Sequence, residues 1–383
     1  MKQNNKFAKR SLAVHKKLRG KISITPKAEV VSKEDLSIYY TPGVGAVSSY
    51  VATHKNESRD YTMKGNMVAV VSDGSAVLGL GNIGPEGALP VMEGKAMLFK
   101  ALAGVDAFPI VLSTQDTEEI IRTVKHIAPG FGGINLEDIA APRCFEIERR
   151  LQVELDIPVL HDDQRGTAVV VLAGLINAMK VVGKKLESSW VTVSGAGAAG
   201  IAIIKLLRLY APKVQILALD SEGVIWKGRK DLNSEKKMLI EKKLIFAEDG
   251  GDLRKALIES DVFIGVSKSG LLKKEDIKLM NKKAIIFALA NPIPEIMPDE
   301  AKAGGAWIVA TGRSDFANQI NNSLGFPGIF RGALDHRVRK ITDQMLLRAA
   351  KNLAALVSRP TRENIIPNTF DKRVVKAVSS AIK

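Results

Sequence analysis

Short apolar runs separated by turn residues and polar helices dominate the chain from residue 67 onward. Runs over residues 67–72 and 107–113 are rich in β-branched and other apolar side chains, which predicts two strands. Residues 89–103 and 117–128 carry apolar positions at helical spacing, which predicts two helices. Strands that alternate with helices are typical of an α/β fold.

A dinucleotide fingerprint follows the strand predicted at residues 190–194. The glycines permit a tight turn and a close approach of pyrophosphate to the N-terminus of the apolar helix that begins there. A second strand, residues 214–219, ends at Asp220, where such folds place the acid that binds the adenosine ribose. The predicted loop residues are Gly195, Gly197, Ala198, Ala199 and Gly200.

Three later apolar runs, at residues 262–266, 284–290 and 307–310, predict further strands of the same sheet. Ser267 and Asn291 stand at the carboxyl ends of two of them, where a doubly wound sheet presents side chains to a cofactor. We therefore expect two domains: an N-terminal α/β substrate domain over residues 1–160, and a Rossmann-type doubly wound dinucleotide-binding domain with C-terminal helices over residues 161–383.

Two acidic pairs, Glu137-Asp138 and Asp162-Asp163, follow apolar runs at 134–136 and 157–160. Each pair would sit at the carboxyl end of a strand, where open α/β sheets keep their ligand crevices. Convergent carboxylates repel one another unless a proton or cation relieves the charge. The oxygen-only donors favour Mg²⁺ or Mn²⁺ over zinc.

The net charge of +15 comes from the two ends of the chain. Residues 1–30 hold nine basic residues against one acid, and residues 331–383 hold twelve against four. Neither end has a nucleic-acid motif, so we expect solvated termini and no nucleic-acid partner. The single cysteine, Cys144, fits a reducing compartment, and we expect a cytoplasmic protein without a membrane span or removable leader.

A set of motifs in fixed order resembles the bacterial short-form malic enzymes. They are YTPGVG from residue 40, SDGSAVLGLGNIGPEGALPVMEGKAMLFK from 72, GINLEDIAAP from 133, HDDQRGTA from 161, the GAGAAG loop, ALANPIPE from 288 and INNSLGFPGIF from 320. The resemblance implies oxidative decarboxylation of malate to pyruvate and CO₂, with reduction of NAD or NADP, in a homodimer.

The resemblance also implies residue roles. Lys95 is the general base that accepts the C2 hydroxyl proton, and Asp162 orients Lys95 or shares its proton. Tyr40 is the acid that protonates the enolpyruvate carbon. A lysine needs a lowered pKa to act as a base near neutrality, and a neighbouring carboxylate opposes this. The implied metal ligands are Glu137, Asp138 and Asp163.

The implied substrate-binding residues are three amides, Asn291, Asn321 and Asn322. The chain departs from the wider family at Ala76, where the animal branch has an arginine, at Asn82, and at Arg165, where histidine is usual. Because Arg165 adjoins the acidic pair, we expect it to bind substrate or to weaken the metal site.

The nucleotide preference rests on opposing charges. Asp220 and Glu222 would repel a 2′-phosphate and favour NAD, whereas Lys227, Arg229 and Lys230 could accept one. We expect NAD, with NADP as the alternative. Two other functions remain open from the residues alone. A different nicotinamide dehydrogenase would act without a divalent cation, and a non-catalytic protein would use its basic termini to bind an acidic partner.

Overall fold

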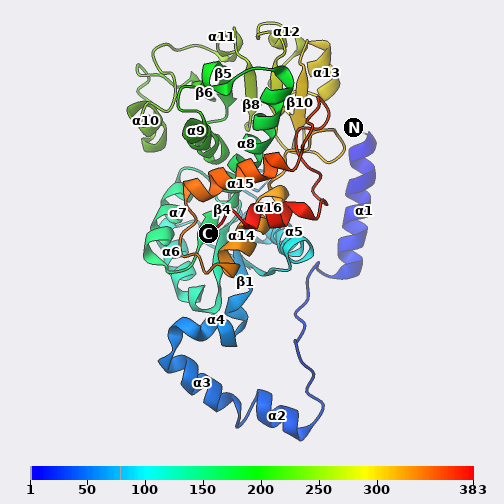
Figure 1. Ribbon diagram of the computed structural model, residues 1–383, viewed down its shortest axis with the longest axis vertical. Coiled ribbons are helices and arrows are strands. Elements are labelled where there is room, and N and C mark those ends of the chain that lie inside the picture. Colours follow the sequence, from blue (N-terminus) through cyan, green and yellow to red (C-terminus); the bar gives the residue numbers. More distant parts are fainter. Residues whose placement is uncertain (1, 78) are drawn as a thin grey trace.

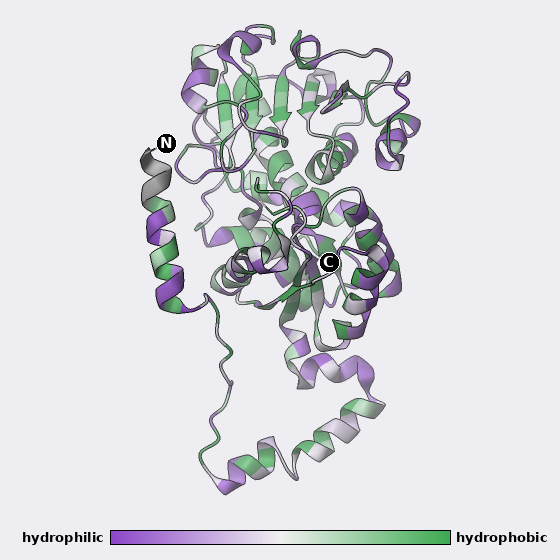
Figure 2. Ribbon diagram, turned by 180° about the vertical axis from the view of Figure 1, so that it is seen from behind, coloured by the Kyte–Doolittle hydropathy of each residue, from purple (hydrophilic) through white to green (hydrophobic). Residues whose placement is uncertain are grey.

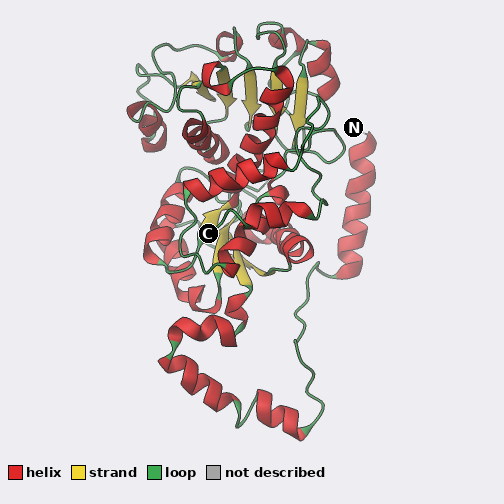
Figure 3. Cartoon of the chain, viewed as in Figure 1, coloured by secondary structure: helices red, strands yellow, loops and turns green. Residues whose placement is uncertain are grey.

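Two separate sheets, one parallel and one mostly parallel, follow one another along the long axis of the molecule, and helices surround each of them (Figures 1 and 3). The computed structural model describes residues 2–77 and 79–383, with side chains from residue 7 onward. Figure 2 shows the strands as mostly hydrophobic and the outer helices as mixed. This arrangement confirms the predicted α/β fold class.

The first sheet has four parallel strands in the order β2-β1-β3-β4. Its strand β1 is completely buried from Val68 to Val71, because helices cover both faces, and this explains its continuous apolar run. The elements are β1 (Met67–Ser72), α5 (Gly84–Ala103), β2 (Asp106–Val111), α6 (Thr117–Ile127), η3 (Ala128–Gly130), β3 (Gly133–Leu136), α7 (Arg143–Glu154) and β4 (Val159–His161).

The second sheet has six strands in the order β10-β9-β8-β5-β6-β7, and only β7 runs antiparallel to its neighbour. The chain builds one side from β5 and then the other from β8, so the direction of winding reverses between these two strands. The elements are β5 (Trp190–Ser194), α9 (Ala198–Tyr210), β6 (Gln215–Asp220), β7 (Gly223–Val224), α10 (Ser234–Glu241), α11 (Leu253–Leu257), β8 (Val262–Gly265), α12 (Lys274–Ile277), β9 (Ile285–Ala288), α13 (Pro298–Ala303) and β10 (Ile308–Thr311).

Helix α8 (Asp162–Val182) connects the two sheets, and η4 (Leu186–Ser188) follows it. It begins at Asp162, directly after the last residue of β4. Among the described residues it is the one helix long and apolar enough to cross a membrane, but 78% of the apolar window is buried inside the protein, as in the core helix of a globular domain.

The chain returns to the first sheet after β10. Helix α14 (Phe326–Asp335) packs against α5, where the rings of Phe326 and Phe330 lie 4.7 and 5.5 Å from that of Phe99. The short η5 (Asn322–Leu324) precedes it, and α15 (Asp343–Ala355) and α16 (Arg373–Ser379) follow. The C-terminal segment therefore joins the two halves of the molecule.

An arm formed by residues 22–61 projects from this body (Figure 1). Helix α1 (Lys2–Leu18) lies beside the body, and the chain then extends outward through α2 (Lys33–Tyr39) and α3 (Val44–Thr53) before η1 (Lys55–Glu57), α4 (Ser58–Tyr61) and η2 (Met63–Gly65) return it. No residue of α2, α3 or α4 is buried. The arm therefore exposes apolar side chains that a single chain leaves uncovered, among them Leu36, Ile38, Tyr39, Tyr40, Val44, Val47 and Tyr50.

Candidate active site

The two acidic pairs meet because their strands are neighbours. Strands β3 and β4 are parallel and in register, with Leu136 opposite His161. The residues that follow each strand therefore emerge side by side at the same edge of the sheet. Asp162 and Asp163 also form the first turn of α8, where the helix dipole favours negative charge.

Three carboxylates converge at this edge. One ligand oxygen from each of Glu137, Asp138 and Asp163 lies within 4.8 Å of the other two. The backbone amide of Asp138 donates a hydrogen bond of 2.8 Å to Asp163, and Asn135 donates one of 2.9 Å to Glu137. Asp138 adopts a left-handed backbone conformation, with φ 54°, which is uncommon for a residue with a side chain. The loop after β3 is thus bent so that both of its acids point to one place.

Lys95 of α5 reaches the same cluster. Its Nζ lies 2.5 Å from Asp162 Oδ2 and 2.7 Å from Glu137 Oε1, and only 7% of its side chain is exposed. The ammonium also lies 4.1 Å from the centre of the Phe326 ring, an attractive cation–π geometry. The predicted base and its predicted partner Asp162 are therefore in direct contact.

Burial and charge act in opposite directions on these groups. Burial lowers the pKa of Lys95, but Asp162, Glu137 and Asp163 together raise it further, so the net shift is upward. Burial raises the pKa of the Glu137 carboxyl well above its ordinary value; Lys95 opposes this shift, and Asp163 adds to it. Lys95 alone does not balance the negative charge gathered around it.

The cluster fits a hard divalent cation. Two acids, Glu137 and Asp162, contact Lys95. The three acids that converge offer only carboxylate oxygens, the donors that Mg²⁺ and Mn²⁺ prefer. Burial is the main cause of the raised Glu137 pKa, and a cation at this point would relieve the repulsion from the neighbouring acids that adds to it. Glu137, Asp138 and Asp163 are the residues that would hold it.

A cavity of about 780 Å³ opens in front of this cluster. Its wall brings together Lys95, the three converging acids and the predicted amides Asn291, Asn321 and Asn322. Asn321 accepts a hydrogen bond from the backbone of Ser323, which fixes its side chain at the start of η5. Cations, carboxylates and amides thus face one space that is large enough for a small polar substrate.

A second cavity, of about 840 Å³, lies along the glycine loop and continues the first, since Val266 and Ser267 line both. Gly195 has a φ of 106°, and a side chain on Gly200 would lie 2.0 Å from the carbonyl oxygen of Gly195. These two positions therefore require glycine. Ala198 and Ala199 line the first cavity, at the N-terminus of α9, so the loop faces both spaces.

Asp220 ends β6 within the second cavity. Its carboxylate accepts hydrogen bonds from Arg229 (2.7 and 3.1 Å) and from Lys236 (2.6 Å). Burial raises the pKa of Asp220, but these two cations lower it further, so the net shift is downward. Arg229, which the sequence offered as an acceptor for a 2′-phosphate, is therefore occupied by Asp220, and Lys227 pairs with Glu248 instead.

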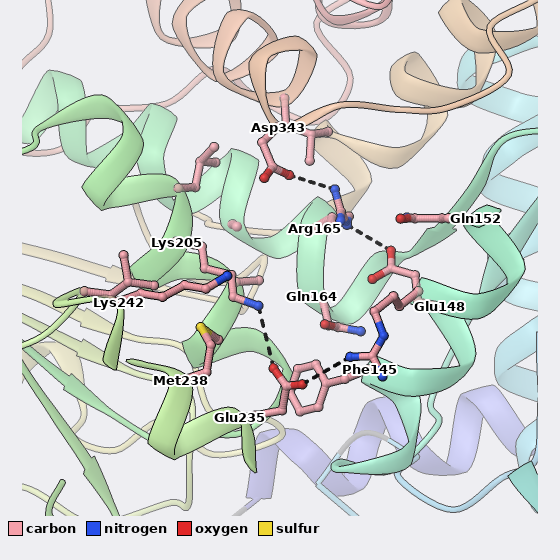
Figure 4. A pocket seen from close by; sticks show the side chains of 16 residues that line it. Phe145, Glu148, Gln152, Gln164, Arg165, Lys205, Glu235, Met238, Lys242 and Asp343 are labelled. Carbon is pink, nitrogen blue, oxygen red and sulfur yellow. Dashed lines mark hydrogen bonds and ion pairs between the residues drawn. The ribbon is translucent and has the colours of Figure 1, made fainter. Parts of the chain in front are cut away.

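Two predicted site residues lie elsewhere. Tyr40 is at the end of α2 on the arm, 66% exposed, and does not line the cavity that contains Lys95. Arg165 points to the opposite side of α8, where its guanidinium lies 3.0 Å from Glu148 and 2.9 Å from Asp343 (Figure 4). In this structure Arg165 therefore approaches neither the three converging acids nor the three amides.

Sequence reasoning missed three contributors. Lys236 contacts Asp220 from sixteen residues away, and Asn135 orients Glu137 from inside β3. The ring of Phe326 packs against the Lys95 ammonium. Phe326 lies in the motif that begins at residue 320, but the motif did not predict this contact. Of the three, only Asn135 could have been found from the sequence, because it is a polar residue inside an otherwise apolar strand.

These features define a nicotinamide-dependent dehydrogenase. Its cofactor cavity adjoins a cavity whose wall contains three converging carboxylates that could hold a cation. The comparisons give the particular family. Residues 19–152 match the family model "Malic enzyme, N-terminal domain", and residues 164–382 match "Malic enzyme, NAD binding domain".

Full-length relatives agree with the family models. The chain is 54% identical over 374 residues to the bifunctional malic/malolactic enzyme of Bacillus subtilis, covering 97% of this chain and 91% of the relative. It is 55% identical over 367 residues to the NAD-dependent malic enzyme of Geobacillus stearothermophilus, covering 95% and 76%.

A solved structure agrees as well. The NAD-dependent malic enzyme of Thermotoga maritima superposes with a TM-score of 0.93 at 52% identity, covering 97% of this chain and 98% of that one. The chain belongs to the malic enzyme family and is an oxidoreductase that uses a nicotinamide cofactor.

Proposed function

We propose that this protein catalyses the divalent-metal-dependent oxidative decarboxylation of (S)-malate to pyruvate and CO₂, with NAD as the hydride acceptor. One observation carries the proposal most directly: Lys95 lies between Asp162 and Glu137 at the edge of the converging carboxylates. The same cavity meets the glycine-loop cavity at Ser267. A base, a cation site and a nicotinamide site would thus face one substrate.

Lys95 is the proposed acceptor of the proton on the C2 hydroxyl. Asp162 holds the Lys95 amine in place and stabilises the positive charge that Lys95 acquires when it accepts the proton. Lys95 loses part of its electrostatic stabilisation when Glu137 and Asp163 engage a cation, so its pKa moves toward values at which an amine accepts a proton. When bound, the cation supplies a Lewis acid for the C2 oxygen, and the nicotinamide accepts the hydride.

Asn291, Asn321 and Asn322 are the proposed ligands of the substrate carboxylates. Their amides donate hydrogen bonds without adding charge, which leaves the net charge of the site to Lys95, the acids and the cation. Three donors on the wall of the same cavity would orient C2 toward the nicotinamide, which is the contribution of positioning to the rate.

Tyr40 is the proposed acid for protonation of the enolpyruvate carbon, and we propose that it enters the cavity of a second copy of the chain. Within one chain it lies on the projecting arm, away from Lys95. The exposed apolar residues around it, including Ile38 and Val47, are of the kind that become buried between subunits. The functional unit would then be a homodimer in which each arm completes the partner's site.

NAD is the proposed nucleotide because Asp220 holds the position of the ribose acid. A 2′-phosphate would meet its carboxylate, and Arg229 and Lys236 are already bound to that carboxylate. The pairing leaves the two cations less free to accept a phosphate.

One assay tests these points together. Malate is supplied with NAD or NADP, with and without Mn²⁺, and reduced nucleotide and released CO₂ are followed. The proposal predicts equal amounts of both products, dependence on Mn²⁺ and a higher kcat/KM with NAD. Full turnover in EDTA would instead indicate a metal-independent dehydrogenase, and a tenfold higher kcat/KM with NADP would overturn the nucleotide preference.

A further inference from the structure

A cavity of about 380 Å³ lies on the far side of α8 from the acidic cluster. It is formed by α7, α8, α9, α10 and α15, and Figure 4 shows its lining side chains. Gln164, Arg165 and Ala168 face it, whereas Asp163, Thr167 and Val170 of the same helix face the catalytic cavity. The first two turns of α8 thus separate the two spaces. The volume is sufficient for a small metabolite.

Two cations in this cavity share one carboxylate as their counter-ion. Lys205 and Arg149 both pair with Glu235, at 3.7 and 3.8 Å, which is longer than a hydrogen bond. Burial lowers the pKa of Lys205, and Glu235 opposes this shift only in part, while Arg165 adds to it. The Lys205 ammonium is therefore in a place where a further negative charge would stabilise it.

The cavity also offers a buried amide. Gln164 is 5% exposed, and its Nε2 has no hydrogen-bond partner among the described residues. A buried donor without a partner costs free energy that a ligand acceptor would recover. The rest of the wall is mixed, with apolar residues such as Phe145 and Met238, a further cation, Lys242, and the acids Glu148, Glu235 and Asp343. Four basic residues against three acids, together with the buried Gln164 amide and the apolar part of the wall, favour a small organic anion.

A chain of bonds connects this cavity to the catalytic acids. Glu148 accepts a hydrogen bond of 2.9 Å from the backbone amide of His161, and it lies 3.0 Å from Arg165 Nε. His161 directly precedes Asp162 and Asp163. An anion that attracts Arg165 would weaken its contact with Glu148 and change how Glu148 holds the start of α8.

We propose that this cavity binds a small anionic metabolite bearing a carboxylate or phosphate group, between Lys205, Arg149 and the Gln164 amide. Its occupation adjusts the position of Asp162 and Asp163 through Arg165 and Glu148. The effect on turnover rests on the function proposed above, whereas binding does not. The cavity is then a second ligand site, separate from those for malate and the nucleotide.

Binding is measured by isothermal titration calorimetry on the full chain, without metal, malate or nucleotide, with two probes. Inorganic phosphate represents the phosphate group and glutarate the carboxylate group. We expect saturable binding of at least one probe, weakened about tenfold or more in Lys205→Gln and in Arg149→Gln. Lys237→Gln, an equal charge change on the exposed side of α10, should leave binding unchanged. If neither probe saturates, or both cavity variants bind like the wild type, the proposal is wrong.

Coupling has a separate readout. The Mn²⁺ concentration for half-saturation, followed by electron paramagnetic resonance of the free ion, should shift at least about twofold when the bound probe is present. The shift should vanish in Lys205→Gln and persist in Lys237→Gln. An unchanged Mn²⁺ affinity with saturated probe would overturn the proposed link through α8. Because neither measurement requires catalysis, an inactive enzyme would contradict the proposed function without affecting this test.

Discussion

Apolar residues are mostly buried in the body of this molecule and exposed on its arm. In the body, strands such as β1 are buried on both faces, and even the charged Lys95 is enclosed between two acids. On the arm, α2 and α3 bury nothing, and Tyr40 is among their exposed residues. The body has a buried core, whereas the arm leaves apolar helices exposed. Exposed apolar surfaces of this kind are typical of sites that bind another protein. The predicted base, Lys95, lies in the body, and the predicted acid, Tyr40, lies on the arm.

The largest effect should come from Lys95 in the body. Lys95→Ala should lower kcat for malate oxidation by about 10²–10⁴-fold, because it removes the proposed proton acceptor. Lys95→Arg serves as the matched control for charge, since it keeps the cation between the acids but cannot accept a proton near neutrality. Both variants should be equally slow when NADH formation is followed. A rate near wild type in either one would remove Lys95 from the role of base.

A smaller change is expected at the acidic cluster. Asp138→Asn should raise the Mn²⁺ concentration for half-maximal activity by at least about tenfold, because an amide replaces a charged ligand. Titration of activity with Mn²⁺ after EDTA treatment measures this. The control is Asp116→Asn, which alters an acid that caps α6. If both variants show the wild-type Mn²⁺ dependence, Asp138 does not hold the cation.

The smallest of the three effects tests the arm. Ile38→Asp places a charge on a residue that is 56% exposed in one chain, so the chain should fold normally but fail to associate. We expect a monomer by light scattering and about tenfold lower specific activity at micromolar protein. Val153→Asp, at a 76% exposed apolar residue of the body, should leave both unchanged. A variant at Ile38 that remains a fully active dimer would show that the arm is not the interface.

Much of the body could be predicted from local sequence. The strands β1, β5 and β8 were expected within one residue of their observed ends, because continuous apolar runs mark strands buried on both faces. The convergence of Glu137 with Asp163 was also foreseeable, since parallel neighbours end at one edge. The positions of two predicted site residues, Arg165 and Tyr40, could not be predicted in this way.

Arg165 and Tyr40 show what local sequence could not supply. Arg165 adjoins the acids in the chain, but a helix turns successive side chains by about 100°, and α8 directs it to Glu148 and Asp343. Tyr40 belongs to the first of the family motifs, and the other motifs lie in the body. Only three-dimensional placement reveals that its segment projects outward. Lys236 was missed because its contact with Asp220 depends on how α10 packs.

Mixing two inactive variants tests the central claim most directly, that two chains build each active site. Tyr40→Phe and Lys95→Ala are each prepared as homodimers, combined in equal amounts and allowed to exchange subunits. In a mixed dimer one site would pair the intact Lys95 of one chain with the intact Tyr40 of the other, so we expect about a quarter of wild-type malate oxidation to return. If no activity returns although mixed dimers form, Tyr40 does not act across the interface.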